Sequence, residues 1–308
     1  MVLGLRWLSV AGVFTALIAL LSLMAYSQVA SDVDARSYWY RYRPLQMGTQ
    51  IEIVNGTRVL GSCSLGFPAY YEVIDRGLKI VTVVYGVVTA SHCGYVGNSV
   101  YQNVTRYNNY IGYMRDEGRI DYRNVVNTNV PDATFIVVES YTYRTGDPRP
   151  PPQIVSYYIH HLGSTLIISN YARSEADIRS ILSYPLIGKA GRTSGYEVGN
   201  ITRLTDEMIR DIGCLAVDSD GIFCYTYRYG WVFLINAYGG PGDSGGPVYI
   251  RYRSFALVLG IAVARAPPDL SWADCVNATY TTNLCSPTAV NPLYNITNAL
   301  QLIPYSYS

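Results

Sequence analysis

The chain has 308 residues, of which 49% are hydrophobic and 15% charged, so it can build a large core and is not a disordered polymer. Its formal net charge is +1, which gives no indication of a nucleic-acid partner.

The N-terminal segment is apolar. An uncharged run from Trp7 to Ala25 follows Arg6. A secretory signal has an apolar stretch of about 7–15 residues, whereas this run, at about 1.5 Å per residue, nearly spans a hydrocarbon core of about 30 Å. Residues 1–27 are therefore predicted to be a signal peptide, cleaved near Ala25-Tyr26-Ser27, or an uncleaved membrane anchor. Either alternative predicts a secreted or cell-surface protein, which meets the membrane only through this segment and only if the segment is uncleaved.

The cysteine count agrees with an exported chain. An even number of cysteines in such a chain indicates disulfides, and this sequence has Cys63, Cys93, Cys214, Cys224, Cys275 and Cys285. Pairing of nearest neighbours would close three local loops, but the sequence alone leaves the connectivity open. No CxxC or Cys/His cluster indicates zinc, and we predict no metal and no cofactor. Glycan acceptor sites in an exporting host would be Asn55, Asn103, Asn200, Asn277 and Asn295.

The first half of the chain is rich in short β-type runs. Residues 28–50 are polar and Arg-rich without a clear period, so we expect a stalk or a short propeptide. Turn residues then separate runs rich in Val, Ile, Tyr and Thr, which are predicted to be strands: Ile51–Val54, Ile80–Ala90, Tyr107–Met114 and Ala133–Glu139.

A proline-rich break, Thr145 to Pro152, divides the chain near residue 150. Beyond it the predicted strands are Thr165–Ser169, Tyr225–Ile235, Val248–Arg253 and Ala256–Val263. Two helices are predicted, one from Ser174 to Ser183 and one from Pro292 to Leu302 with Asn291 as its cap. The pattern indicates a mostly β chain with a C-terminal helix.

One serine stands in an unusual setting. Five glycines and two prolines surround Ser244 between Tyr238 and Tyr249. A serine hydroxyl becomes a nucleophile only with a base within hydrogen-bond reach. Of the three histidines, His160 and His161 lie beyond the proline break, whereas His92 follows an apolar strand and precedes Cys93. The setting of His92 favours it as the base.

These two motifs resemble a known family. Gly242-Asp243-Ser244-Gly245-Gly246-Pro247 and Thr89-Ala90-Ser91-His92-Cys93 are similar to the serine and histidine motifs of chymotrypsin-like (trypsin-like) serine peptidases. Cys63–Phe67 and Gly191–Gly195 resemble the bacterial branch of streptogrisins and α-lytic protease. The resemblance runs from about residue 53 to the end and is poor between about 140 and 185.

The resemblance implies an all-β fold of two antiparallel Greek-key β-barrels with a short C-terminal helix. Residues 51–143 would form the first barrel, 144–184 a linker and insertion, and 185–308 the second barrel with the helix.

The resemblance also implies an activity and its residues. The chain would be a serine endopeptidase, acting on peptide or protein substrates through an acyl-enzyme, with His92, Asp132 and Ser244 as its triad. Asp132 heads an apolar strand, and Asp121 is the alternative. The backbone N–H groups of Gly242 and Ser244 would form the oxyanion hole. The competing hypotheses are a catalytically silent surface binding protein of the same fold and an ester hydrolase.

Asp243 would be a buried structural carboxylate that needs a cationic partner. Two partners are open: a newly cut N-terminus at Ile53, as in animal-type members, or an internal arginine, as in the bacterial type. We favour the arginine, with Arg192 as the candidate.

Substrate contacts follow from the same motifs. Tyr238 would lie near the floor of the primary pocket. Ala262, Val263 and Ala264 would form the strand that pairs with the substrate backbone. Arg265 would narrow the pocket or attract an acidic side chain, unless it faces solvent.

Overall fold

The computed structural model describes residues 37–102, 109–115, 131–184, 186–205, 208–218, 221–229, 232–265 and 287–307. For residues 205, 208–218, 221–229, 238, 265 and 287 it describes the backbone alone. The predicted signal peptide or anchor, Asp121, Cys275 and Cys285 lie outside the described residues. No helix within these ranges is both long and apolar enough to cross a membrane.

The first sheet has eight strands and is built around the apolar strand β5 (Ile80–Thr89). β5 pairs along its whole length with β8 (Thr134–Arg144) and, from Ile80 to Val87, with β4 (Pro68–Asp75), both antiparallel. The order across the sheet is β20-β4-β5-β8-β7-β6-β2-β3. The remaining strands are β2 (Gln50–Asn55), β3 (Arg58–Ser64), β6 (Ser99–Tyr101), β7 (Tyr110–Met114) and β20 (Ile303–Pro304).

The second sheet has ten strands. Its principal order is β1-β9-β10-β18-β17-β11-β12, and β19 joins β18 to β16, which pairs in turn with β13. The bounds are β1 (Gln46–Met47), β9 (Tyr158–His161), β10 (Ser164–Tyr171), β11 (Ile187–Gly191), β12 (Gly195–Gly199), β13 (Ile201–Thr205), β16 (Val232–Tyr238), β17 (Pro247–Tyr252), β18 (Phe255–Arg265) and β19 (Pro287–Pro292).

The predicted fold class is confirmed: the described residues form two large, mainly antiparallel sheets and a separate two-stranded hairpin, with a short helix near the C-terminus. Two strand pairs depart from the antiparallel expectation, because β1 pairs with β9 and β10 pairs with β18 in parallel. Parallel pairs need a long crossover between their strands. Both pairs satisfy this, since each joins segments far apart in the sequence.

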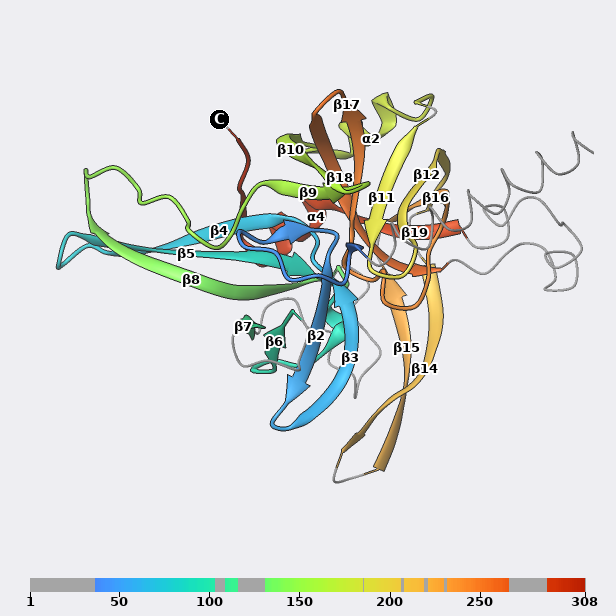
Figure 1. The fold of residues 1–308 in the computed structure, drawn as a ribbon, viewed down its shortest axis with the longest axis horizontal. Coiled ribbons are helices and arrows are strands. Elements are labelled where there is room, and N and C mark those ends of the chain that lie inside the picture. Colours follow the sequence, from blue (N-terminus) through green and yellow to red (C-terminus); the bar gives the residue numbers. More distant parts are fainter. Residues whose placement is uncertain are drawn as a thin grey trace, which may run out of the picture.

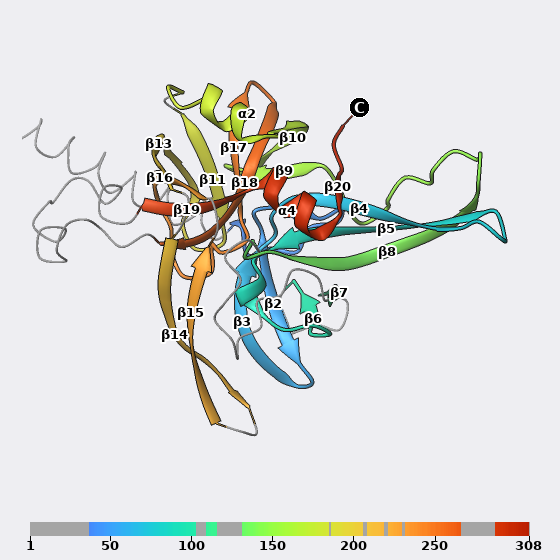
Figure 2. The same ribbon diagram turned by 180° about the vertical axis from the view of Figure 1, so that it is seen from behind.

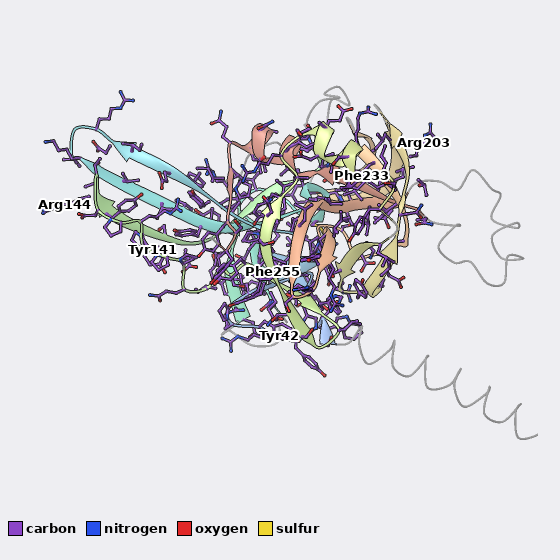
Figure 3. The ribbon with its side chains drawn as sticks, turned by 90° about the horizontal axis from the view of Figure 1, so that it is seen from above. Tyr42, Tyr141, Arg144, Arg203, Phe233 and Phe255 are labelled. Carbon is purple, nitrogen blue, oxygen red and sulfur yellow. A yellow bond between two sulfur atoms is a disulfide. The ribbon has the colours of Figure 1, made fainter. Side chains whose placement is uncertain are left out.

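Two extensions leave the body of the molecule (Figures 1 and 2). The outer halves of β4, β5 and β8 form a long arm, and Figure 3 shows Tyr141 and Arg144 of β8 on this arm, far from Phe233 of the second sheet. The second extension is the hairpin of β14 (Met208–Asp218) and β15 (Gly221–Tyr229). Its register sets Cys214 opposite Cys224, but their side chains are not described, so their disulfide stays a prediction.

The segment before residue 51 differs from the expected stalk or propeptide. Tyr38, Leu45 and Met47 are fully buried in the core, and the backbone N–H of Leu45 donates to the carbonyl of Ile154 over 2.8 Å. These apolar side chains leave water on folding, which is why residues 37–50 pack as part of the body. The predicted linker and insertion, 144–184, contains β9 and β10 of the second sheet. The domain boundaries themselves stay a prediction.

Both predicted helices are present but shorter than expected. Helix α2 (Glu175–Ser180) begins after Ser174, whose hydroxyl accepts from the N–H of Asp177 in a capping box. Helix α4 (Leu293–Leu300) has Pro292 as its N-cap, so the prediction of Asn291 as the cap is wrong. Asn291 lies within β19 instead, where its backbone pairs with Ile261, and Pro292 ends the strand opposite Gly260.

Candidate active site

The histidine and aspartate motifs meet at the inner end of β5 and β8. In the antiparallel register Thr89, the last residue of β5, lies opposite Thr134, the first residue of β8. The residues just beyond β5 therefore face those just before β8. His92 lies in a one-turn 3-10 helix, Ser91–Cys93, and its Nδ1 lies 2.6 Å from Oδ2 of Asp132.

The carboxylate of Asp132 is buried and held at both oxygens. Its Oδ1 accepts from the hydroxyl of Ser91 (2.7 Å) and from the backbone N–H of His92 (3.0 Å). Burial alone would raise its pKa, but the adjacent His92 charge and these hydrogen bonds lower the pKa below its ordinary value of 3.8. Asp132 is therefore an anion that accepts the Nδ1 proton, which leaves Nε2 of His92 as the basic nitrogen.

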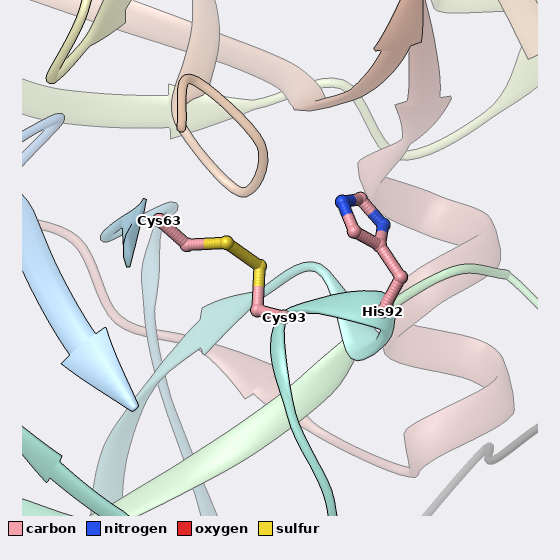
Figure 4. Close-up of side chains that lie close together, drawn as sticks. All are labelled: Cys63, His92 and Cys93. Carbon is pink, nitrogen blue, oxygen red and sulfur yellow. A yellow bond between two sulfur atoms is a disulfide. The ribbon is translucent and has the colours of Figure 1, made fainter. Parts of the chain in front are cut away.

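A disulfide holds the same turn in place. Cys93 is bonded to Cys63 at the end of β3, as the nearest-neighbour pairing predicts (Figure 4). The possible metal-ligand atoms of Cys63, Cys93 and His92 lie within 4.8 Å of one another. Because the two sulfurs are bonded to each other, they offer no thiolate to an ion. This cluster therefore does not provide the ligand set of a zinc site.

The Ser244 loop packs against this turn. The backbone carbonyl of Ser244 accepts from the N–H of Ser64 over 2.9 Å. Gly245, at φ +87°, has no room for a side chain: a Cβ there would collide with the Thr89 hydroxyl and lie 3.0 Å from the backbone nitrogen of Ala90. The glycine after Ser244 thus brings the loop against the backbone that leads directly to His92.

The two amides predicted to form the oxyanion hole are oriented by their neighbours. The hydroxyl of Thr193 donates to the carbonyl of Pro241 over 2.5 Å, so the N–H of Gly242, across the same trans peptide, points the other way. The carbonyl of Asp243 accepts from Gly246 (2.9 Å), which likewise turns away the N–H of Ser244. Within the described part of the chain, neither N–H donates a hydrogen bond. Both are available to an oxyanion.

The partner of Asp243 is a lysine, so the prediction of Arg192 is wrong. Nζ of Lys189 lies 2.8 Å from Oδ2 of Asp243, and both side chains are buried. Lys189 is preferred because β11 carries it into the core beside the Ser244 loop, and its Nζ also donates to Ser194 over 2.6 Å.

The carboxylate of Asp243 is fully occupied without a new N-terminus. Backbone N–H groups of Gly240, Thr193 and Ser194 all donate to it, at 2.8, 2.8 and 3.1 Å. Burial would raise its pKa, but the charge of Lys189 and these donors lower the pKa below 3.8. Ile53 lies inside β2, paired with Gly61 and Val100, which contradicts its alternative role as a cut terminus contacting Asp243.

Replacing Lys189 by methionine removes the cation and leaves the Asp243 carboxylate buried. We expect the free energy of unfolding, measured with urea, to fall by about 3–5 kcal/mol. The double variant Lys189→Met/Asp243→Asn should recover most of this loss, because it buries no unpaired charge and keeps an acceptor for the backbone donors. A loss below about 1 kcal/mol for Lys189→Met alone would show that the pair does not stabilise the fold.

The predicted substrate strand lies beside the serine. Ala262 of β18 bonds the serine loop through both backbone groups: its carbonyl accepts from Gly245 (2.7 Å) and its N–H donates to Gly246 (2.9 Å). Ala262 and Val263 are buried, and Ala264 is partly exposed. The pairing of β17 with β18 ends at Pro247 and Ile261, so the three residues of the predicted substrate strand lie beyond the part of β18 that β17 covers. The side chains of Tyr238 and Arg265 are not described, so their roles stay predictions.

The other two histidines connect the N-terminal segment and the second sheet. Nδ1 of His160 donates to Gln46 (2.9 Å), and its Nε2 accepts from Ser37 (2.8 Å). Nε2 of His161 accepts from Arg251 (2.9 Å), which fixes Nδ1 as the donor to the Tyr249 hydroxyl (3.1 Å). Burial lowers the pKa of both to about 4, helped by the charge of His161 on His160 and by that of Arg251 on His161.

Because the pKa values of these two histidines are lowered, we expect the protein to lose stability in acid. Their folded pKa of about 4 lies below the ordinary 6.5, so the unfolded chain binds more protons between these values. Their contribution is complete above pH 6.5 and decreases as the pH falls toward 4. Urea unfolding at a series of pH values should show this decrease, and the double variant His160→Gln/His161→Gln should show a shallower one. Equal slopes in the two proteins would contradict the expectation.

Three residues of the site were not predicted in these roles: Lys189, Ser64 and Thr193. Ser64 is buried, and its hydroxyl donates to the carbonyl of Gly242 (2.9 Å) and accepts from the N–H of Arg192 (3.0 Å). Of these three, Lys189 could have been found from the sequence, because it is one of only two lysines and a lysine among the neighbours Ile187, Gly188 and Ala190 indicates a buried, paired cation.

Comparison with known proteins gives a likeness to solved structures and no match in sequence. No family model matches the sequence, and a search of curated proteins finds no match. Among solved structures, the chain is similar to Thermobifida fusca protease A and to Cellulomonas bogoriensis chymotrypsin. Each has 16% identity and a TM-score of 0.48, over 85% of this chain and 98% of the other. Because the identity and the TM-score are both low, the function proposed below rests on the side chains of this chain's own site.

Proposed function

We propose that the chain is a serine endopeptidase with Ser244 as nucleophile, His92 as general base and acid, and Asp132 as the residue that orients the imidazole. The observation that carries this proposal is the 2.6 Å contact between the buried Asp132 carboxylate and Nδ1 of His92, on a turn packed against the Ser244 loop. Such a contact fixes the tautomer and stabilises the imidazolium that forms when Nε2 accepts a proton.

The steps follow from these groups. Nε2 of His92 takes the proton of the Ser244 hydroxyl as its oxygen attacks the peptide carbonyl. The negative charge that develops on the carbonyl oxygen is stabilised by the N–H groups of Gly242 and Ser244. The imidazolium returns the proton to the leaving amine, and the C–N bond breaks. Water then hydrolyses the acyl-enzyme by the same route, and Ser244 is regenerated.

The Asp243–Lys189 pair would support the reaction without touching substrate. It holds Gly240, Thr193 and Ser194 around one carboxylate, and Thr193 in turn orients the Pro241–Gly242 peptide. Preorganised donors need little rearrangement when the charge develops. A chain with this internal pair is expected to be active without a cut that frees a new N-terminus. Export, with residues 1–27 as signal or anchor, belongs to the same proposal.

The test is cleavage of a mixed peptide library by residues 28–308, with cut sites identified by mass spectrometry. We expect cuts within peptides, which defines an endopeptidase, and none with Ser244→Ala. A small ester assayed in parallel separates a peptidase from an ester hydrolase. Folded protein that cuts neither peptides nor ester would support the binding protein and overturn the proposal.

A further inference from the structure

Arg192 is a cation without an anionic partner at the edge of the candidate site. It stands in the turn between β11 and β12, half-buried. Its Nε is buried and has no hydrogen-bond partner. Within the described ranges no carboxylate forms an ion pair with it. A buried donor without a partner costs free energy, so such a group calls for an explanation.

The backbone of Arg192 is held firmly in place. Its N–H donates to the hydroxyl of Ser64 over 3.0 Å, and its carbonyl accepts from Nε1 of Trp39 over 2.6 Å. The guanidinium carbon lies 5.8 Å from the centre of the ring of Trp39, an exposed residue. An aromatic ring at this distance attracts the cation without using its hydrogen-bond donors, which are left for an anion.

The guanidinium lies directly beside the oxyanion glycine. A Cβ placed on Gly242 would lie 2.8 Å from Cδ and 2.9 Å from Nη1 of Arg192. The arginine side chain therefore occupies the space next to one of the two proposed oxyanion donors.

The position relative to Ser244 indicates which half of the substrate it meets. The predicted substrate strand reaches the serine loop at Gly245 and Gly246, after Ser244. Arg192 reaches the loop at Gly242, before Ser244. Because both backbone groups of Ala262 already bond the serine loop, an extended peptide would place its acyl half along Val263 and Ala264, and the residues after the scissile bond would leave on the Arg192 side.

We propose that Arg192 determines specificity on the leaving-group side, by pairing with an acidic side chain within the first two residues after the scissile bond. This inference rests on the proposed peptidase activity and deepens it. A guanidinium forms charge-assisted hydrogen bonds with a carboxylate in a forked geometry, which neutral amides and cations cannot reproduce. Substrates with Asp or Glu at these positions are the predicted class.

The test uses matched fluorogenic peptides that carry Glu, Gln or Lys at the first or second position after the scissile bond. For the wild type we expect kcat/KM about tenfold higher for Glu than for Gln, a ratio that falls as salt is raised. Arg192→Gln should abolish the preference, Arg192→Glu should turn it toward Lys, and Arg192→Lys should keep part of it. Thermal unfolding of each variant checks that it is folded.

Two controls separate the inference from the proposed function. A peptidyl anilide, which has no residue after the scissile bond, gives each variant's reference rate. Arg76→Gln, at the exposed turn between β4 and β5, should keep the wild-type ratio. A wild type that cleaves the anilide but shows no preference for Glu, or a preference unchanged in Arg192→Gln, overturns this inference alone. A wild type that cleaves nothing overturns both.

Discussion

Ser244→Ala should reduce kcat on a peptide by a factor on the order of 10⁶ and leave the fold intact. The variant removes one oxygen from a half-buried side chain. The loop is held by the backbone carbonyl of residue 244, which accepts from Ser64, and by the Asp243–Lys189 pair, and alanine preserves both. A residual acceleration of about 10³–10⁴ over water is expected from the oxyanion donors and substrate binding.

The measurement is kcat with a fluorogenic peptide, together with the thermal midpoint. Ser180→Ala is a suitable control, because this serine on α2 is exposed and, among the described residues, its hydroxyl donates only to the carbonyl of Asp177 in the same helix. It should keep the wild-type kcat. Cleavage by Ser244→Ala within tenfold of the wild type would remove Ser244 from the role of nucleophile.

Asp132→Asn should reduce kcat by about 10⁴ with a small change in KM. Two donors, the Ser91 hydroxyl and the His92 N–H, point at Oδ1. The oxygen of an asparagine would occupy this position, which turns its NH₂ group toward Nδ1 of His92. Nδ1 must then accept, the proton moves to Nε2, and the imidazole can no longer take the proton of Ser244.

This prediction is checked by steady-state kinetics of folded Asp132→Asn and of Asp132→Glu, which keeps a carboxylate at a shifted position. A tautomer effect lowers kcat and leaves substrate binding in place. If Asp132→Asn retained more than about a tenth of the wild-type kcat, the 2.6 Å contact would be structural and another group would orient His92.

The core of the site could be predicted from the sequence because short segments carry it. The motifs around His92 and Ser244 are contiguous, and Asp132 precedes an apolar strand that reads clearly as β. Register then brings Asp132 to His92, since β5 and β8 pair up to Thr89 and Thr134. The motifs are local, but their convergence was implied by the resemblance to a known family and not by any local pattern.

What the sequence did not predict depends on contacts between distant segments. Lys189 and Asp243 are 54 residues apart, and only the pairing of β11 with β17 brings them together. Arg192 was expected because the resembled bacterial type uses an internal arginine, and no local pattern shows that Lys189 reaches Asp243 first. The burial of Tyr38 and Leu45 was missed for a similar reason: isolated apolar residues in a polar segment show no period, although both contribute to the core.

The most direct test of a Ser244 nucleophile activated by His92 is labelling with a fluorophosphonate, followed by mass spectrometry of the intact and digested protein. We predict one adduct per folded chain, on Ser244, formed much more slowly in Asp132→Asn and absent after unfolding. Folded protein without an adduct on Ser244, or with labelling equally fast in Asp132→Asn, would contradict it.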